Sequence, residues 1–383
     1  MNTPKLRFKE FNDTWKKIQL SSFVNINPQN DSLPEKFIYI DLESVNNGLL
    51  TSKKIINRSE APSRAKRTII KNDILYQTVR PYQMNNLFIN SLDSDYPYIA
   101  STGYALLRTK ENPYFVYSIL HQKSFVNKVL DMCTGTSYPA INATDLGKIS
   151  VGLPSIKEQE KISRTLELLD KKIELQTKKI EDLKLFKKGL IDYIIKNIET
   201  EKIPLKNILV EQNYKTTKNN EYEILSSTAK GIYLQKDYFN KQAASDNNIG
   251  YKILKKNQLV LSPQNLWMGN ININKEYNIG IVSPSYKVFN INDNIDINFF
   301  NYWIKSAKAL YKYKISSEQG ASIVRRNLNM DLFYEIVADI PKGKWQNEIG
   351  KIIKLLDLKV QYNENSLQKL LDLKKGLMQN MFV

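Results

Sequence analysis

Histidine and cysteine are almost absent from this chain of 383 residues, which contains His121 and Cys133 as the single residue of each kind. One cysteine cannot form an intramolecular disulfide, and it rules out a multi-cysteine metal site. One histidine rules out histidine-based zinc sites and most acid–base chemistry that depends on imidazole. We therefore expect no metal ion and no disulfide bond in this chain.

Long apolar runs are also missing. No stretch approaches the roughly 20 residues that a membrane-spanning helix needs. The first 15 residues are polar and charged, which is not typical of a signal peptide. The sequence also lacks a Walker-type phosphate loop and a G-x-G-x-x-G motif after a strand. Segments 95–98 and 112–115 look like the tetrad of amino-methyltransferases, but neither has its consecutive prolines. These absences predict a cytoplasmic protein without catalytic activity of its own.

Acidic residues are outnumbered by basic ones, 39 against 56, so the formal net charge is +17. General richness in lysine and asparagine explains part of this excess. Segments 158–197 and 344–383 together carry +5, which leaves +12 on the rest of the chain. A positive surface of this kind attracts a polyanion, and in the cytoplasm that is usually nucleic acid.

One long segment of the sequence occurs twice. Residues 153–195 align without a gap with residues 340–382, at an offset of 187, and 13 of the 43 positions are identical. Both copies contain Leu-Leu-Asp and Lys-Lys-Gly-Leu at equivalent positions. A duplicated segment of this length indicates a chain built from two related halves.

Each copy predicts a long coiled-coil helix. Apolar residues recur at alternating steps of four and three, which is the 3.5-residue repeat of such helices. Each helix would span about 40 residues, or about 60 Å, and the natural partner of each copy is the other copy. The predicted seam between them includes Leu169, Gln176 and Leu183 in the first copy and Leu356, Asn363 and Leu370 in the second. The seam is interrupted at Gln176 and Lys187, and the second copy has its interruptions at the equivalent Asn363 and Lys374.

The segments between the helices predict mixed α and β structure. Apolar runs bounded by turn residues predict strands at 37–40, 69–76, 87–89 and 104–107, followed by one helix at 113–130. The second half repeats this order at lower similarity. The fold class is therefore α+β: two globular α/β domains alternate with two long helices, which pair as an antiparallel coiled coil about a pseudo-two-fold axis.

With this plan the chain resembles the specificity subunit of type I restriction–modification systems, a family with two target-recognition domains and two conserved helical regions. The matching stretches are LPSIKEQEKISRTLELLDKKI and IPKGKWQNEIGKIIKLLDLKV, the endings LKLFKKGL and LLDLKKGL, and the opening KLRFKEF followed by Trp15. Gln159 and Gln346 follow the Leu/Ile-Pro starts. Trp345 departs from the pattern, because the first copy has Glu158 at this position.

The resemblance implies a DNA-binding subunit whose partners carry out the chemistry. Each target-recognition domain would read one half of a split, asymmetric double-stranded DNA site. The helices would set the spacing and recruit two methylation subunits with S-adenosylmethionine, and the full complex would add two ATP-driven restriction subunits. The expected boundaries are 1–153 for the first target-recognition domain, 154–199 for its helix, 200–340 for the second domain and 341–383 for its helix. The alternative is a non-catalytic nucleic-acid-binding coiled-coil scaffold of another system.

Candidate DNA-binding residues cluster in polar loops of both globular segments. Arginine can pair bidentately with guanine, glutamine and asparagine can pair with adenine, and clustered cations can hold phosphates. The candidates are Arg58, Arg64, Lys66, Arg67, Gln77, Arg80, Tyr82, Gln83, Ser137 and Tyr138 in the first segment, and Gln264, Asn265, Trp267, Ser322, Arg325, Arg326 and Asn327 in the second. Antiparallel helices would place the half-sites about one DNA turn apart, roughly 34 Å.

Overall fold

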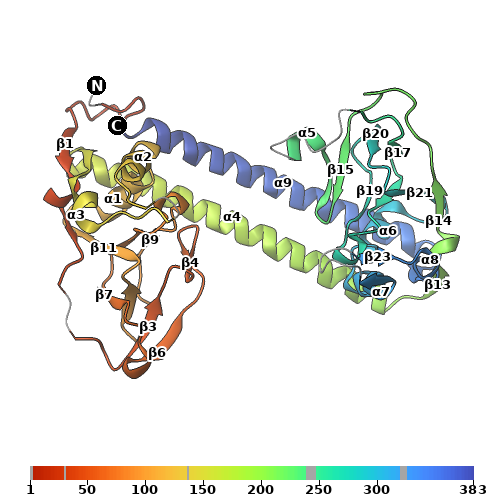
Figure 1. Cartoon of the computed structure of the whole chain (residues 1–383), viewed down its shortest axis with the longest axis horizontal. Coiled ribbons are helices and arrows are strands. Elements are labelled where there is room, and N and C mark those ends of the chain that lie inside the picture. The colour runs from red at the N-terminus through yellow and green to blue at the C-terminus, as the bar shows by residue number, and fades with distance from the viewer. Residues whose placement is uncertain (1–2, 30–31, 136–137, 239–246, 320–325) are drawn as a thin grey trace. The chain divides into compact units, whose positions relative to one another are not determined.

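The chain forms two compact units, here called unit 1 and unit 2. Unit 1 comprises residues 1–178 and 365–383, and unit 2 comprises residues 179–364. The computed structural model describes all residues except 1–2, 30–31, 136–137, 239–246 and 320–325. Each unit contains one globular segment and one portion of each long helix, α4 (Ile156–Lys196) and α9 (Trp345–Asn380), which Figure 1 labels.

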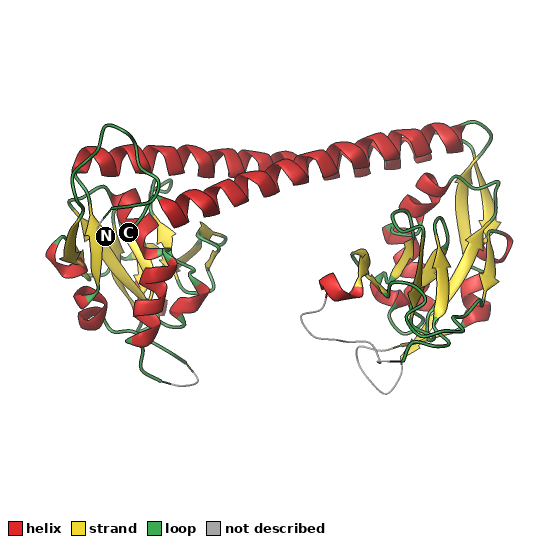
Figure 2. Cartoon of the chain, turned by 90° about the horizontal axis from the view of Figure 1, so that it is seen from above, coloured by secondary structure: helices red, strands yellow, loops and turns green. Residues whose placement is uncertain are grey.

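Unit 1 contains two four-stranded sheets with short helices beside them (Figure 2). The first sheet is antiparallel throughout and has the order β2 (Val24–Ile26), β11 (Tyr104–Thr109), β8 (Ile74–Gln77) and β9 (Leu87–Phe88). The second has the order β6 (Lys54–Asn57), β3 (Lys36–Ile40), β10 (Tyr98–Ser101) and β7 (Ala65–Ile69), with β3 and β10 parallel. The remaining elements are β1 (Lys16–Gln19) paired with β12 (Ser150–Leu153), β4 (Val45–Asn46) paired with β5 (Leu49–Leu50), and α1 (Pro113–Leu120), α2 (Lys123–Asp131) and α3 (Ala143–Lys148).

Unit 2 contains an antiparallel sheet with the same kind of order. Its strands run β14 (Leu209–Gln212), β21 (Lys287–Ile291), β18 (Leu259–Leu261) and β19 (Ile271–Ile273). Two-stranded pairs are β13 (Thr200–Pro204) with β24 (Val337–Pro341), β15 (Leu225–Thr228) with β16 (Gly231–Leu234), β17 (Lys252–Lys255) with β20 (Ile279–Val282), and β22 (Ser317–Gln319) with β23 (Arg326–Leu328). The short helices are α5 (Gln235–Tyr238), α6 (Ile297–Trp303), α7 (Ala307–Ile315) and α8 (Met330–Tyr334).

Two elements expected from the sequence are broken in the structure. The single strand predicted at 69–76 is divided into β7 and β8, because Asn72 adopts a left-handed φ of 71°. Asp73 is buried there, accepts the Ile70 amide at 2.8 Å and is held by both arms of Arg108. The single helix predicted at 113–130 is divided into α1 and α2, because Gln122, the N-cap of α2, has an extended backbone. This change of direction brings Ile119 and Phe125 into the same core.

The starts of the two long helices are joined to their globular segments by equivalent glutamines. Gln159 is buried; its side-chain oxygen accepts the backbone amide of Asn112 at 3.1 Å, and Asn112 is the N-cap of α1. Gln346 likewise accepts the backbone amide of Asp296, the N-cap of α6. The Asn-Pro-Tyr-Phe segment at 112–115 is therefore a helix cap followed by a proline at the first helical position.

The acidic residue that distinguishes the first helix start has a structural role. Glu158 is 1% exposed, and both of its oxygens accept hydrogen bonds from Arg7 at 2.8 Å. The indole of Trp15 donates to the same carboxylate at 3.3 Å. A carboxylate in the first turn is also favoured by the helix dipole. At the equivalent position Trp345 is 46% exposed, and α9 begins at this residue.

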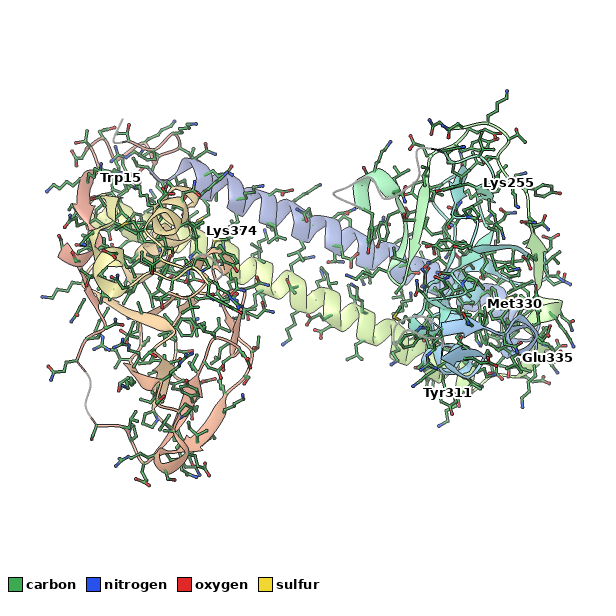
Figure 3. The ribbon with its side chains drawn as sticks, viewed as in Figure 1. Trp15, Lys255, Tyr311, Met330, Glu335 and Lys374 are labelled. Carbon is green, nitrogen blue, oxygen red and sulfur yellow. The ribbon has the colours of Figure 1, made fainter. Side chains whose placement is uncertain are left out.

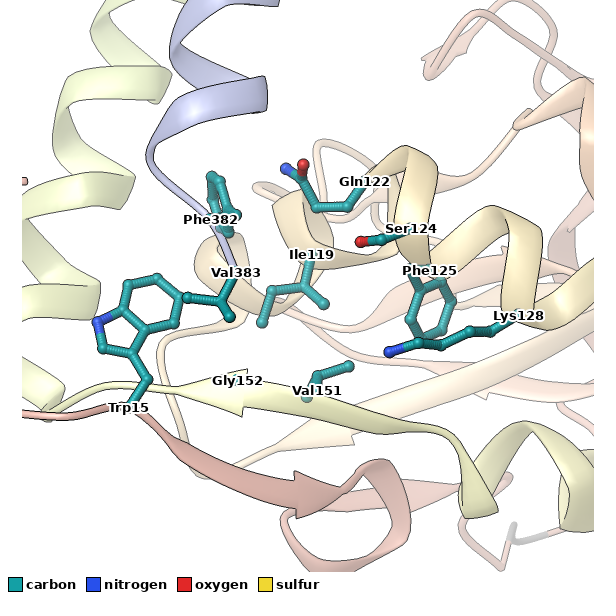
Figure 4. Close-up of a pocket in the computed structure, with 10 residues that line it drawn as sticks. All are labelled: Trp15, Ile119, Gln122, Ser124, Phe125, Lys128, Val151, Gly152, Phe382 and Val383. Atoms are coloured by element: carbon teal, nitrogen blue, oxygen red, sulfur yellow. The ribbon is translucent and has the colours of Figure 1, made fainter. Parts of the chain in front are cut away.

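The core of unit 1 includes residues from both chain ends. Phe382, which follows α9, packs against Phe115 with 5.4 Å between ring centroids and against Trp15 at 6.3 Å. Figure 4 shows Phe382 and Val383 beside Trp15 and Ile119, around a narrow cavity of about 20 Å³. The N-terminal segment and the end of α9 therefore stabilise the same hydrophobic cluster in unit 1.

The predicted seam positions of both helices are shielded from solvent. Leu169 and Asn363 are buried, whereas Gln176, Leu183, Leu356 and Leu370 are half-buried. Within unit 1, Lys374 of α9 pairs with Asp170 of α4 at 2.5 Å (Figure 3 labels Lys374). Within unit 2, Lys187 of α4 pairs with Asp357 of α9.

Candidate nucleic-acid interface

The loop after β8 in unit 1 is organised from inside by Gln77. This side chain is 2% exposed; its nitrogen donates to the Val79 carbonyl at 2.7 Å and to Gln83 at 2.8 Å, and its oxygen accepts the Asn85 amide at 3.1 Å. An amide whose donors and acceptor are used in this way cannot also pair with a base. The structure therefore places Gln77 as a support of the loop, whereas the sequence suggested a base-reading residue.

Arg80 occupies an unusual backbone conformation in this loop. Its φ and ψ are both 55°, in the left-handed region, and its amide donates to the Pro139 carbonyl at 2.8 Å. A residue with a side chain loses roughly 1 kcal/mol or more there. The surrounding hydrogen bonds must therefore hold Arg80 in place.

The guanidinium of Arg80 lies over the ring of Tyr138, with 4.5 Å between Cζ and the ring centroid. Tyr138 is 63% exposed and Tyr82 is 49% exposed. Gln83 is exposed as well, although it holds the amide of Gln77. These side chains form a surface with one cation, two aromatic rings and an amide. Ser137, predicted for the same surface, lies outside the described residues.

The basic cluster at 58–67 runs from the end of β6 into β7, the two outer strands of the other sheet of unit 1. Arg58, Arg64 and Lys66 are exposed, and Arg58 and Lys66 line a shallow depression of about 440 Å³. Arg67 is half-buried on β7; burial lowers its pKa, and its Nε has no hydrogen-bond partner among the described residues. The cluster thus offers at least three solvent-facing cations, which suits phosphate contacts.

One turn connects this basic cluster with the Arg80 loop. Thr102 donates its amide to the Arg64 carbonyl at 2.9 Å. The next carbonyl, that of Gly103, accepts both the amide and the hydroxyl of Thr78, at 3.0 and 2.8 Å. The two groups of candidates, separated in the sequence, therefore flank the same turn between β10 and β11. Nothing in the sequence indicated this bridging role of the turn.

In unit 2 an arginine also stacks on an aromatic ring, but from the opposite segments. The guanidinium of Arg326 lies over the ring of Trp267 at 4.9 Å, and the Arg326 amide donates to the Gln264 carbonyl at 3.2 Å. Trp267 follows β18, as Arg80 follows β8. Arg326 belongs to β23, in the later segment that corresponds to the Tyr138 loop. In unit 1 the loop after β8 supplies the arginine and the later segment supplies the ring, whereas in unit 2 the loop after β18 supplies the ring and the later segment supplies the arginine.

The other candidates of unit 2 surround this pair. Gln264 and Asn327 are exposed, and Asn265 is half-buried at the start of the 3-10 turn Leu266–Met268. Ser322 and Arg325 lie outside the described residues. Sequence reasoning missed Lys305, whose ammonium donates to the carbonyls of Gly269 and Ala229 at 2.9 and 3.2 Å. Burial lowers the pKa of Lys305 to about 8, and its contacts fix the end of the Trp267 turn.

The long helices carry exposed apolar side chains outside the seam. Leu168 and Leu175 of α4 are 61% and 59% exposed in unit 1, and their equivalents Leu355 and Tyr362 of α9 are 66% and 75% exposed in unit 2. Exposed apolar groups at equivalent positions mark surfaces suited to protein contacts.

Neither a metal-binding cluster nor a membrane-spanning helix is found among the described residues. Among them there is no group of three or more histidine, cysteine, aspartate or glutamate side chains that could bind a metal ion. Within the same described residues, no helix is apolar and long enough to cross a bilayer.

Comparison with known proteins shows which family this chain resembles. Residues 12–185 match the family model described as the type I restriction modification DNA specificity domain. This part of the chain therefore resembles the specificity domain of that family. The resemblance predicted from the repeated helices and their motifs is confirmed.

Individual relatives agree with this assignment. The specificity subunit of the type I restriction enzyme HindI from Haemophilus influenzae is 29% identical over 168 residues. That match covers 41% of this chain and 36% of the relative, about a third of its length. The fold is that of the S subunit of a type I restriction–modification system from M. genitalium, with a TM-score of 0.59, 18% identity and coverage of 100% of this chain and 99% of that one. A chain of a type I system studied for its complex assembly and conformational transition has a TM-score of 0.54 at 16% identity, covering 95% and 96% of the two chains.

Proposed function

We propose that this chain is the DNA-binding specificity subunit of a type I restriction–modification complex and is itself non-catalytic. The observation that carries the proposal is the arginine–aromatic pair that each unit presents beside further polar loop residues. Guanidinium groups and rings suit contacts with bases and phosphates. Each unit would read one half of a split, asymmetric site on double-stranded DNA.

The long helices would pair antiparallel as a coiled coil and set the distance between the half-sites. Contacts inside each unit support this. In unit 2, Lys184 pairs with Glu364 at 2.6 Å and Lys187 pairs with Asp357, so later residues of α4 meet earlier residues of α9. The pair of Asp170 and Lys374 in unit 1 is the counterpart of the pair of Asp357 and Lys187 at the offset of 187 residues. The equivalence supports an internal two-fold repeat with the domain boundaries given above.

The partners would supply the chemistry. Exposed apolar residues such as Leu168 and Leu355 would bind two methylation subunits, one for each half of the chain. S-adenosylmethionine would be bound by these subunits, and ATP by the restriction subunits of the full complex. Such a complex would act on DNA in the cytoplasm.

Exchange of residues 200–339 for the same region of a relative tests whether each unit reads its own half of the DNA site. The chimera is co-expressed with its methylation subunits, and the modified sites are found by methylome sequencing. We expect one half of the site to change and the other half and the spacer to stay. A change in both halves would refute the modular reading, and the absence of any site-specific methylation with the unaltered chain would refute the proposed function.

A further inference from the structure

Arg80 combines a constrained backbone with a guanidinium that is stacked on an aromatic ring. Its left-handed φ of 55° is held by the amide bond to Pro139, and its guanidinium stacks on Tyr138. The side chain donates no hydrogen bond to any residue that the structure describes. Stacking covers one face of the planar group, so the N–H groups along its edge are left for a ligand.

Several hydrogen bonds hold the loop that carries Arg80 in one conformation. The buried amide of Gln77 joins Val79, Gln83 and Asn85, and the Gln77 backbone amide donates to Asn86 Oδ1 at 2.8 Å. Val79 also forms a β-bridge with Ala140, next to the Tyr138 segment. Disfavoured backbone conformations persist where their surroundings hold them, and they cluster at functional positions. The loop therefore fixes the position of the Arg80 Cα and thereby limits where its guanidinium can point.

Such rigidity distinguishes base contacts from phosphate contacts. A cation that neutralises a phosphate acts mainly as a charge and tolerates a range of positions. A bidentate contact with a base edge requires a guanidinium in a defined plane. In the major groove, guanine offers two acceptors, O6 and N7, at the spacing of the guanidinium fork.

We infer that Arg80 reads one guanine, through O6 and N7, in the half-site bound by unit 1. This rests on the proposed function, because it presumes that unit 1 binds duplex DNA. It goes further in naming the base and the residue that recognises it.

The test uses the full chain assembled with its methylation subunits and a duplex that carries its methylation site. The half-site of unit 1 is the half that stays unchanged when residues 200–339 are exchanged. Each guanine of that half is replaced in turn by 7-deazaguanine, which lacks the N7 acceptor, and by inosine, which keeps O6 and N7. Dissociation constants are measured at one fixed salt concentration for wild type, Arg80→Ala, Arg80→Lys and Arg326→Ala.

With the wild-type chain we expect 7-deazaguanine at one position to weaken binding roughly 2- to 10-fold, because it removes one of the two acceptors of the bidentate pair, and inosine there to have little effect. Arg80→Ala removes both contacts, so it should weaken binding to the natural duplex roughly 5- to 100-fold and abolish the response at that guanine. Arg80→Lys keeps the charge but loses the planar fork, so it should bind with a smaller response at that guanine than wild type. Arg326→Ala serves as the matched control, because its stacked arginine belongs to unit 2, and it should leave the response intact.

Three results would overturn the inference while the proposed function stands. In the first, the half-site of unit 1 contains no guanine. In the second, both Arg80 variants keep every response to 7-deazaguanine. In the third, both variants weaken binding equally on all sequences, which would assign Arg80 to a phosphate contact. Failure of the wild-type complex to prefer any site would overturn the proposed function as well. If Arg80→Ala lowers the midpoint of thermal unfolding sharply, the inference is judged from the responses of wild type and Arg80→Lys to 7-deazaguanine.

Discussion

Asp170 and Lys374 form an ion pair in unit 1, with 2.5 Å between Oδ1 and Nζ. The second oxygen of Asp170 accepts the hydroxyl of Tyr114, whose pKa is raised by burial and by the neighbouring carboxylate, so the tyrosine stays protonated. Lys374 stands where the apolar repeat of α9 is interrupted. Lys374, at this interruption, thus pairs with the aspartate of the repeated Leu-Leu-Asp motif. In unit 2, Lys187 pairs in the same way with Asp357.

The first prediction concerns this pair. Lys374→Met should lower the free energy of unfolding by roughly 0.5–1 kcal/mol, since both partners are about one third exposed and water screens them. Combined with Asp170→Asn in a double-mutant cycle, it should give a coupling energy of similar size. Urea denaturation of the four proteins measures both quantities. Lys375→Met, at an exposed neighbouring position, is the control, and a coupling energy of zero would remove the pair as a stabilising contact.

The second prediction concerns pH and the single histidine. Burial lowers the pKa of His121 below its usual 6.5; its Nδ1 contacts the Tyr117 carbonyl at 2.8 Å, and its Nε2 faces the Asn86 amide nitrogen at 3.3 Å. The unfolded chain therefore binds a proton more readily, and stability should fall as the pH drops below 6.5 towards the lower folded-state pKa. His121→Gln should flatten this dependence. Urea denaturation between pH 7 and 5 checks it; equal pH slopes for both proteins would contradict the assignment.

The third prediction concerns salt. DNA affinity should fall steeply with salt concentration, since bound cations displace counterions from phosphates. Replacing Arg64, Lys66 and Arg67 with alanine should weaken binding to all sequences. It should also reduce the slope of log affinity against log salt by up to about 0.9 for each phosphate that the cluster no longer neutralises. Replacing exposed Lys123 on α2 provides a control of equal charge change per residue. An unaltered slope in the triple variant would place the cluster away from the DNA backbone.

The fourth prediction concerns the helix register. Asn363 is 4% exposed and donates to the Lys359 carbonyl at 2.7 Å, and Gln176 is half-buried. Polar residues in an apolar seam fix register at a cost in stability. Replacing both with leucine should therefore raise the thermal midpoint and loosen the required spacer length in methylome data. A fixed spacer together with a lower midpoint would argue against this role, and Glu181→Ala, at an exposed position outside the seam, is the control.

The sequence by itself determined the features that depend on local periodicity. Apolar residues at steps of four and three specify α4 and α9 wherever the rest of the chain lies, because a helix face depends only on neighbouring turns. The offset of 187 residues likewise identified the equivalent positions, including Lys187 and Lys374. The polar loops at Arg80 and Trp267 were found because turn residues and cations interrupt apolar strands there.

Only the tertiary structure decided what those loops do. The left-handed backbone of Arg80 and its stacking on Tyr138 depend on a segment more than 50 residues away in the chain, which no local pattern encodes. The break between α1 and α2 arises in the same way, since both short helices must bury residues in one core. Helical periodicity is a property of the neighbouring sequence, whereas the position of a loop side chain is set by hydrogen bonds to distant segments.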